Sequence, residues 1–330
     1  MFLGRGTAQD VALAGDLQGT VALISPAPST PRDLISSLSA RGVLGILEVG
    51  SAPSLLIRYS YIPTNMILDG ARPLERVGPD VANELLAGSG ATLQELEDRL
   101  TRSGAAFVAT PNRVSLSVKL VPIRDAATRN VLAMIQGSDP SADFVIVGGH
   151  YDHVGADPGG AIFQGANDNA SGSAVVVALA EYFAQRHIQP KATIIFAAWT
   201  GEEAGLVGSA YYTNHPLFPL AKTRAYINLD VVGAGSGAGL TITNDSPALA
   251  NVARASAKDL GITFGGSAVG GGSDHESFLR AGVPATFFIW QQYGDIHVPG
   301  DTFDKIDPAK LTKTGQAAAL TLLRLAGFAQ

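Results

Sequence analysis

Short apolar runs and helical patterns alternate along the C-terminal two thirds of the chain. The apolar runs are typical of buried strands and cover residues 145–150, 192–199, 225–230 and 285–290. After the first of them, Val176, Leu179, Ala180 and Phe183 form the apolar stripe of a helix. This alternation predicts an α/β fold, a three-layer sandwich around a mixed, mostly parallel central sheet.

Two further strands are expected before the first buried run. Apolar and polar residues alternate between Val114 and Leu120, which is typical of a half-buried strand. Residues 130–135 form the next apolar run, and Asp139-Pro140 then turns the chain. We therefore expect two or three adjacent antiparallel strands to lead into the mostly parallel sheet.

The first 112 residues have a different pattern of expected elements and of polar residues. Residues 20–24 and 43–49 are typical of short strands, with a helix between them, and residues 62–67 form a further extended piece. Thr92 and Glu95 have the spacing of a capping box at a helix start. The segment has no histidine and its acids are scattered. We interpret residues 1–112 as a small α/β accessory domain, and residues 113–330 as the domain that carries the chemistry.

Composition narrows the possible functions. The net charge of -6 provides no basic field, which argues against binding to nucleic acid or to an anionic membrane. No apolar run is long enough to insert into a bilayer, and the first residues do not form a signal peptide. The chain has no cysteine, so any metal must be held by His, Asp and Glu.

Such residues recur where predicted strands end or helices begin: His150, Asp168, Glu203, Asp230 and His297. The loops that follow the strands of an open α/β sheet converge on one crevice. Five ligands are one too many for a single zinc, whereas one shared carboxylate and two pairs suit two ions. The small residues around Asp168 favour it as the bridging ligand.

Each of these residues also has an ordinary structural interpretation. A lone histidine can end a strand, as at His150, and Asp168 could serve only as a helix N-cap. Glu202 and Glu203 could be solvated loop acids. Their position after a buried strand favours a division of labour instead, in which one glutamate binds metal and its neighbour takes a proton. Asp152, two residues after His150, is placed to accept the spare imidazole N–H.

Together these segments resemble a known family, the zinc-dependent aminopeptidases of metallopeptidase family twenty-eight, of the bacterial leucyl aminopeptidase type. The resemblance spans residues 130–307 and is carried by His150-Tyr151-Asp152-His153, Asn167 to Gly172, Trp199 to Gly205, Asn228-Leu229-Asp230, Ser273-Asp274-His275, Ile296-His297 and Asp301-Thr302. The first 112 residues resemble a protease-associated domain, and relatives with such a module usually have a helical segment before it. The resemblance therefore implies a zinc exopeptidase-like fold with this accessory module.

The resemblance also implies roles for individual residues. Asp168 would bridge two Zn²⁺ ions, with His150 and Asp230 completing one site and Glu203 and His297 the other. Glu202 would be the general base, Asp152 would support His150, and the peptide bond after Asp168 would be cis. The substrates would be the N-termini of peptides or proteins, and the location periplasmic or secreted.

Several residues near these motifs keep two interpretations. Tyr293 could stabilise the oxyanion or form part of the pocket wall, and Asp301 could orient His297 or only shape a turn. Asp274 and His275 match the family motif and are expected to order a loop or the substrate. The remaining histidines are expected to face solvent: His153, His187 and His215.

Substrate preference and the reaction itself have alternatives. Phe287, Phe288, Trp290 and Tyr293 suggest an apolar side-chain pocket, although the phenylalanines could be ordinary core residues. A glutaminyl cyclase with one zinc, or a binding protein that keeps the peptidase fold without activity, are the alternative functions. A carboxypeptidase would need an arginine cluster, and Arg280 is the one arginine close in sequence to the later motifs. The sequence does not determine the oligomeric state.

Overall fold

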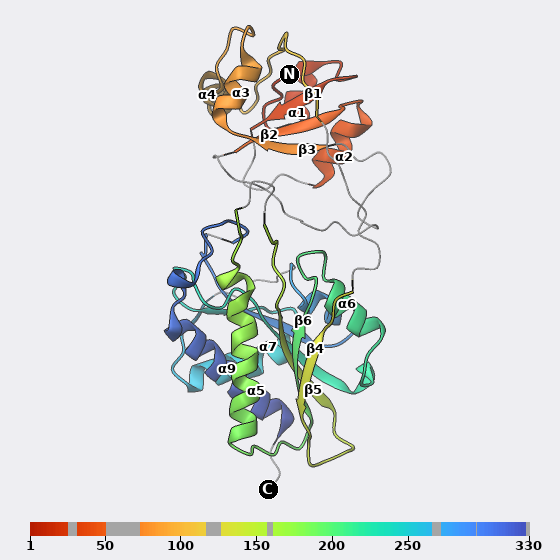
Figure 1. Cartoon of the computed structure of the whole chain (residues 1–330), viewed down its shortest axis with the longest axis vertical. Coiled ribbons are helices and arrows are strands. Elements are labelled where there is room, and N and C mark those ends of the chain that lie inside the picture. The colour runs from red at the N-terminus through yellow and green to blue at the C-terminus, as the bar shows by residue number, and fades with distance from the viewer. Residues whose placement is uncertain are drawn as a thin grey trace. The chain divides into compact units, whose positions relative to one another are not determined.

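The computed structural model describes residues 1–25, 32–50, 73–116, 127–156, 161–265, 272–294 and 296–327. These residues divide into two units, one containing the described residues up to 116 and the other those from 127 onwards (Figure 1). None of the helices in these ranges combines the length and apolarity needed to cross a membrane.

The first unit is built on three parallel strands in the order β1-β2-β3. Its elements are α1 (Ala8–Ala14), β1 (Val21–Ile24), α2 (Arg32–Ala40), β2 (Gly45–Val49), β3 (Leu74–Val77), α3 (Pro79–Leu86) and α4 (Leu93–Ser103). Alternate residues of β1 pack into two different cores. Leu23 packs with α3 and α4, whereas Ala22 and Ile24 pack with α1 and α2. Helices therefore cover both faces of this small sheet, as an α/β pattern requires.

The capping box predicted at Thr92 is confirmed, because its side chain accepts from the Glu95 N–H and the Glu95 side chain accepts from the Thr92 N–H. The extended piece expected at residues 62–67 lies outside the described residues.

The second unit is organised around a seven-stranded sheet among its described residues, in the order β4-β6-β5-β7-β10-β8-β9. The strands are β4 (Val131–Ile135), β5 (Phe144–His150), β6 (Ile194–Trp199), β7 (Thr223–Leu229), β8 (Leu240–Ile242), β9 (Phe264–Gly265) and β10 (Ala285–Trp290). β5, β6, β7 and β10 run parallel, while β4 and β8 are antiparallel to their neighbours β6 and β10. The predicted mixed, mostly parallel sheet is confirmed.

Helices cover both faces of this sheet. They are α5 (Ser171–Gln185), α6 (Val207–Asn214), α7 (Pro247–Asp259), α8 (His275–Arg280) and α9 (Pro308–Ala326), with short helices η2 (Ala166–Ala170), η3 (Leu220–Lys222) and η4 (Phe303–Lys305). Val145 and Val147 pack with α5, α7 and α9 on one face, and Ile146 packs with α6 and α8 on the other. Figure 1 shows α5 and α9 along one face and α6 on the other. The expected three layers are present.

The antiparallel entry into the sheet differs from the expectation. β4 pairs with β6 rather than with β5, so β6 lies between the two strands that are consecutive in sequence. Of the strand expected between Val114 and Leu120, residues 114–116 have no strand structure, and residues 117–120 lie outside the described residues. Alternation alone predicted the strand, and it does not reveal whether a partner strand is available.

The parallel strands bring the predicted site residues to one edge of the sheet. β5 ends at His150, and the loops after β6 and β7 begin with the segments that hold Glu202, Glu203 and Asp230. His297 follows β10. Because the carboxyl ends of parallel strands lie at the same edge, these side chains can meet.

Candidate metal centre

Asp168 lies between two histidines that come from distant strands. Its Oδ1 is 3.3 Å from His150 Nε2, and its Oδ2 is 2.9 Å from His297 Nε2. Asp168 is 4% exposed, so water competes little for these contacts. The two oxygens of one buried carboxylate thus face two separate groups of nitrogen and oxygen atoms, as a bridging ligand would.

Potential ligand atoms gather on either side of Asp168. His150, Glu202 and Asp230 form one group, and His153, Glu203 and His297 join Asp168 in the other, with atoms of each group within 4.8 Å of one another. His150 Nε2 lies 3.3 Å from Asp230 Oδ1, yet both atoms are buried and neither forms a hydrogen bond with another described residue. Buried polar atoms of this kind are costly unless something else satisfies them. Imidazole nitrogens and carboxylate oxygens fit zinc.

The loop after β5 supports His150 differently from the prediction. His150 Nδ1 donates to the backbone carbonyl of Asp152 at 3.1 Å, while the Asp152 carboxylate is 3.7 Å away. That carboxylate instead accepts the backbone N–H groups of Glu202 and Glu203, at 3.1 and 3.2 Å. The ring N–H of His150 is thus accepted by the carbonyl of Asp152, and the Asp152 carboxylate is an ion-pair neighbour of the ring. The carbonyl still fixes hydrogen on Nδ1, which leaves Nε2 for a metal.

The Asp301 carboxylate also contacts a different segment from the one predicted. Its Oδ1 accepts the backbone N–H of Asn167 at 2.8 Å, and its Oδ2 accepts that of Asp168 at 3.0 Å. The carboxylate is thus committed to the Asp168 segment rather than to His297. Asp301 was expected to orient His297 because the two residues are close in sequence. Its carboxylate instead contacts the backbone of Asn167 and Asp168, which are far away in sequence.

The asparagines that flank Asp168 attach it to the segment after β7. Asn167 Oδ1 accepts from the N–H of Gly233 and of Ala234, and Asn169 Nδ2 donates to the Leu229 carbonyl. The peptide bond between Asp168 and Asn169 is cis, as the resemblance implied. These bonds place Asp168 beside Asp230.

A buried chain of hydrogen bonds ends on Asp230. Trp199 Nε1 donates to the Tyr226 hydroxyl at 2.8 Å, and that hydroxyl donates to Asn228 Oδ1 at 2.6 Å. Asn228 Nδ2 then donates to Ser273 Oγ, which donates to Asp230 Oδ2, both at 2.7 Å. Oδ2 is held in this way, and Oδ1 remains directed at His150.

The adjacent glutamates have opposite electrostatic environments. Burial, reinforced by the charges of Asp230 and Asp274, raises the pKa of Glu202 to about 10. Burial would also raise the pKa of Glu203, but hydrogen bonds from His153 and His297 lower it below its ordinary value. In this arrangement Glu202 favours its protonated form and Glu203 its ionised form.

The two histidines beside Asp168 hold protons strongly when no cation is near. Burial alone would lower the pKa of His297, but its bonds to Asp168 and Glu203 raise it to about 10. In the same way, Asp230 and Asp168 raise the pKa of His150 well above its ordinary value in spite of its burial. A cation that binds here must displace these protons.

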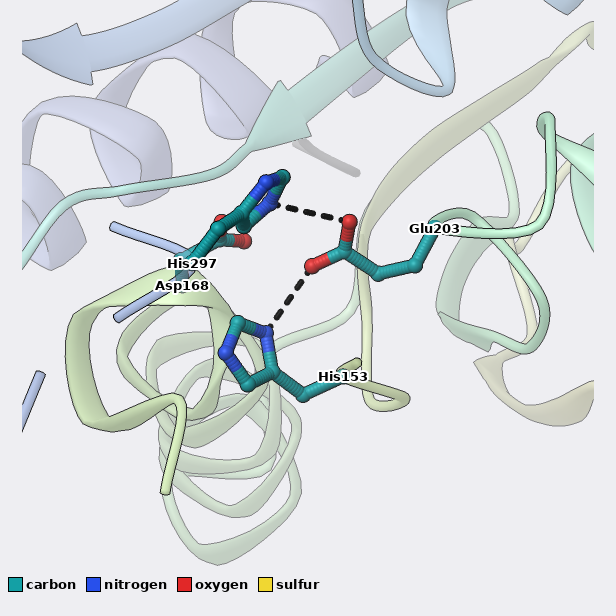
Figure 2. A group of neighbouring side chains, drawn as sticks. All are labelled: His153, Asp168, Glu203 and His297. Carbon is teal, nitrogen blue, oxygen red and sulfur yellow. Dashed lines mark hydrogen bonds and ion pairs between the residues drawn. The ribbon is translucent and has the colours of Figure 1, made fainter. Parts of the chain in front are cut away.

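His153 was expected to face solvent, and this prediction was wrong. Its side chain is 10% exposed, and Nδ1 lies 2.9 Å from Glu203 Oε1 (Figure 2). The signal in the sequence was its position three residues after His150 in the same strand-end loop. His187 and His215 are exposed as predicted.

Asp274, His275 and Tyr293, which each had two interpretations, differ in their surroundings. Asp274 is buried, and burial raises its pKa to about 7. His275 is buried against Phe287 and lies 3.8 Å from Asp245. Burial and the charges of Asp230 and Asp168 raise the pKa of Tyr293, so its hydroxyl keeps its proton near the site.

The predicted apolar pocket residues divide between the two faces of β10. Phe288 and Trp290 belong to the main core of the second unit. Phe287 forms a separate cluster with Val231 and Ile289, against which Tyr293 and Ile296 pack. Because Val231 follows Asp230 and Ile296 precedes His297, this apolar cluster adjoins the candidate ligands.

The model of peptidase family M28 matches residues 130–322 of this chain, a range that contains every candidate ligand. The chain belongs to peptidase family M28. Aminopeptidase YwaD of Bacillus subtilis is 26% identical over 328 residues, which cover 94% of this chain and 63% of that protein. Leupeptin-inactivating enzyme 1 of Streptomyces exfoliatus is 35% identical over 157 residues, 47% of this chain and 34% of that enzyme. The M28 chain thus spans less than two thirds of the length of both.

Solved structures are similar to this chain in fold. The aminopeptidase from Aneurinibacillus sp. strain AM-1 has a TM-score of 0.66 at 24% identity, and the match covers 100% of this chain and 74% of that one. A zinc aminopeptidase from Bacillus subtilis has a TM-score of 0.64 at 22% identity, covering 98% and 74%. These matches concern the fold.

Proposed function

We propose that this M28 protein is an aminopeptidase of the leucyl type that uses two zinc ions to remove N-terminal residues from peptides. The observation that carries the proposal is Asp168, whose two oxygens face His150 on one side and His297 on the other. The names of two relatives, aminopeptidase YwaD and the Aneurinibacillus aminopeptidase, support the reaction class.

Each zinc ion has a proposed set of protein ligands. His150 and Asp230 would hold one ion together with Asp168 Oδ1. Glu203 and His297 would hold the other together with Asp168 Oδ2, and His297 Nε2 lies 2.9 Å from an oxygen of each carboxylate. Three protein ligands per ion leave a position open, as catalytic zinc requires.

Zinc bound at these positions would activate a water molecule and polarise the scissile carbonyl. Glu202 Oε2 lies 4.0 Å from His150 Nε2, in the same group of potential ligand atoms, and we assign it to proton transfer instead of metal binding. Nearby cations lower the pKa of a carboxyl group, which prepares Glu202 to act as a base at neutral pH. Glu202 then takes a proton from the attacking water and gives it to the leaving amine nitrogen, which returns Glu202 to its ionised form.

Two features support the substrate class. The apolar cluster of Val231, Phe287, Ile289, Tyr293 and Ile296 adjoins Asp230 and His297, and it suits an apolar N-terminal side chain. We assign the Tyr293 hydroxyl as a donor to the developing oxyanion, since its raised pKa keeps the proton in place.

We also propose that residues 1–112 form an accessory module of the protease-associated type. Its three parallel strands, with helices on both faces, support an independently organised α/β unit. The candidate ligands and the general base all lie in the other unit, so the module would act on substrate access or on stability rather than in the chemistry.

The test compares the same substitution at the two adjacent glutamates. Metal-free protein is titrated with zinc while hydrolysis of leucine p-nitroanilide is followed. Wild type should reach full activity near two zincs per chain. Glu202→Gln should bind both zincs and lose about 10²- to 10⁴-fold in kcat, because only the proton transfer is removed. Glu203→Gln should lose tight binding of one zinc.

Three results would contradict the proposal. Glu202→Gln with wild-type turnover would remove Glu202 from the role of base. Saturation at one zinc per chain, with N-terminal glutamine converted to pyroglutamate, would indicate a glutaminyl cyclase. A chain that takes up no zinc at neutral pH would indicate a peptidase-like binding protein.

A further inference from the structure

The loop after β5 contacts the adjacent glutamates at two levels. The Asp152 carboxylate accepts the backbone N–H groups of Glu202 and Glu203. The next residue, His153, contacts the side chain of Glu203 through Nδ1 at 2.9 Å. One short loop thus constrains both where the Glu203 backbone lies and where its carboxylate points.

The two oxygens of Glu203 face different imidazoles. Oε1 faces His153 Nδ1 and Oε2 faces His297 Nε2, each at 2.9 Å (Figure 2). An ionised carboxylate only accepts hydrogen bonds, so the hydrogen in the first contact belongs to His153 Nδ1. Oε1 is occupied by this bond, and Oε2 is the oxygen directed towards His297.

The ring of His153 has little freedom to turn away. Gly165 has a φ of +62°, and a Cβ there would lie 2.6 Å from His153 Cγ. The ring therefore rests directly on the Gly165 backbone. On its other side it lies 5.7 Å from the His297 ring, measured between centroids, and the next residue, Val154, is buried in the protein.

We propose that His153 is a positioning residue, whose Nδ1–H fixes Glu203 Oε1 so that Oε2 is presented to the zinc shared with Asp168 and His297. This inference rests on the proposed zinc site, and it assigns to His153 a part in metal binding beyond the five candidate ligands. Groups that orient a metal ligand typically contribute 10- to 100-fold to metal affinity.

The competing possibility is that His153 is itself a ligand, because one of its nitrogens lies within 4.8 Å of the potential ligand atoms of Asp168, Glu203 and His297. The two roles differ in chemistry. An asparagine amide offers an N–H close to the place of Nδ1 but is a poor zinc ligand. A glutamine amide extends towards the place of Nε2 and leaves Glu203 Oε1 without its donor.

The experiment measures zinc affinity of the full chain by competition with a chromophoric chelator. The variants are His153→Ala, His153→Asn and His153→Gln, and the control is His187→Asn at an exposed histidine. We expect His153→Ala and His153→Gln to weaken one of two zinc sites about 10- to 100-fold. His153→Asn should recover affinity to within about threefold of wild type, since it restores the hydrogen-bond donor.

Each other outcome overturns the inference. Equal losses in His153→Asn and His153→Ala, with a changed absorption spectrum of the cobalt-substituted protein, would make His153 a ligand. Unchanged zinc affinity in His153→Ala, with only a lower melting temperature, would make its role structural. If the alanine variant does not fold, the comparison of asparagine with glutamine decides alone. Wild-type protein that binds no zinc would instead contradict the proposed function itself.

Discussion

Replacing Asp301 by asparagine should loosen the segment that carries Asp168. The Asp301 carboxylate is 2% exposed, and each of its oxygens accepts one backbone N–H, from Asn167 and from Asp168. Hydrogen bonds to a charged group contribute about 1.5–3 kcal/mol each, and a buried donor left without a partner costs about 1–3 kcal/mol. Asparagine keeps one acceptor and turns its NH₂ group towards the other N–H. We expect the free energy of unfolding to fall by about 2–4 kcal/mol.

The assay uses the positions of the two tryptophans. Trp199 and Trp290 both lie in the second unit, so their fluorescence reports its unfolding without a contribution from the first. Urea unfolding of the metal-free protein excludes stabilisation by bound zinc. With a slope of about 2 kcal/mol per molar urea, the midpoint should fall by about 1–2 M. Zinc affinity should fall as well, since Asp168 is the proposed bridging ligand.

The matched control is Asp304→Asn, which makes the same change at an exposed residue of η4. The reasoning would be refuted if the unfolding free energies of Asp301→Asn and Asp304→Asn agreed within about 0.5 kcal/mol, because surface substitutions ordinarily cause changes of this size. It would mean that the two backbone donors find other partners without cost.

Three further predictions follow from the site. Tyr293→Phe should lower kcat for leucine p-nitroanilide about 10²-fold with zinc affinity unchanged, whereas a higher KM alone would make the ring part of the pocket wall. Gly165→Ala should lower the unfolding midpoint and the zinc affinity, because its Cβ would lie 2.6 Å from both the Asp168 backbone oxygen and His153 Cγ. The control is Gly261→Ala, with a similar φ of +67° and no atom within 4 Å, which should affect the midpoint alone. Apparent zinc affinity should rise from pH 6 to pH 9, because His297, with a pKa of about 10, must lose a proton to bind metal. Calorimetry in buffers of different ionisation enthalpy should show this proton release. A zinc affinity independent of pH would contradict the assignment of His297 as a ligand.

The fold and the meeting place of the candidate ligands were the features most accessible from the sequence. Short apolar runs such as residues 145–150 are typical of buried strands of a covered sheet, and β5 extends from Phe144 to His150. Parallel strands end at one edge, so a polar residue at each strand end, such as His150 or Asp230, was expected to reach a common place. These inferences depend on local pattern and on a general rule of sheet geometry.

The supporting contacts were not accessible in the same way. Asp152 and Asp301 were assigned to histidines a few residues away, but their carboxylates accept backbone N–H groups from segments about 50 and 134 residues away. His153 appeared to be exposed because its partners, Glu203 and Gly165, are brought to it only by the fold. Val114 and its neighbours alternated like a strand, and alternation does not reveal whether pairing occurs. Such contacts depend on tertiary packing, which periodicity does not encode.

The buried chain from Trp199 to Asp230 has a fixed direction. An indole nitrogen can only donate, so the Tyr226 hydroxyl must accept from Trp199 and use its own hydrogen for Asn228. The Asn228 Nδ2 group then donates to Ser273 Oγ, and the Ser273 hydroxyl donates to Asp230 Oδ2. The order of donors and acceptors at Asp230 thus follows from a residue four hydrogen bonds away. The indole in the core therefore orients the whole chain and directs the hydrogen of Ser273 at this oxygen of Asp230.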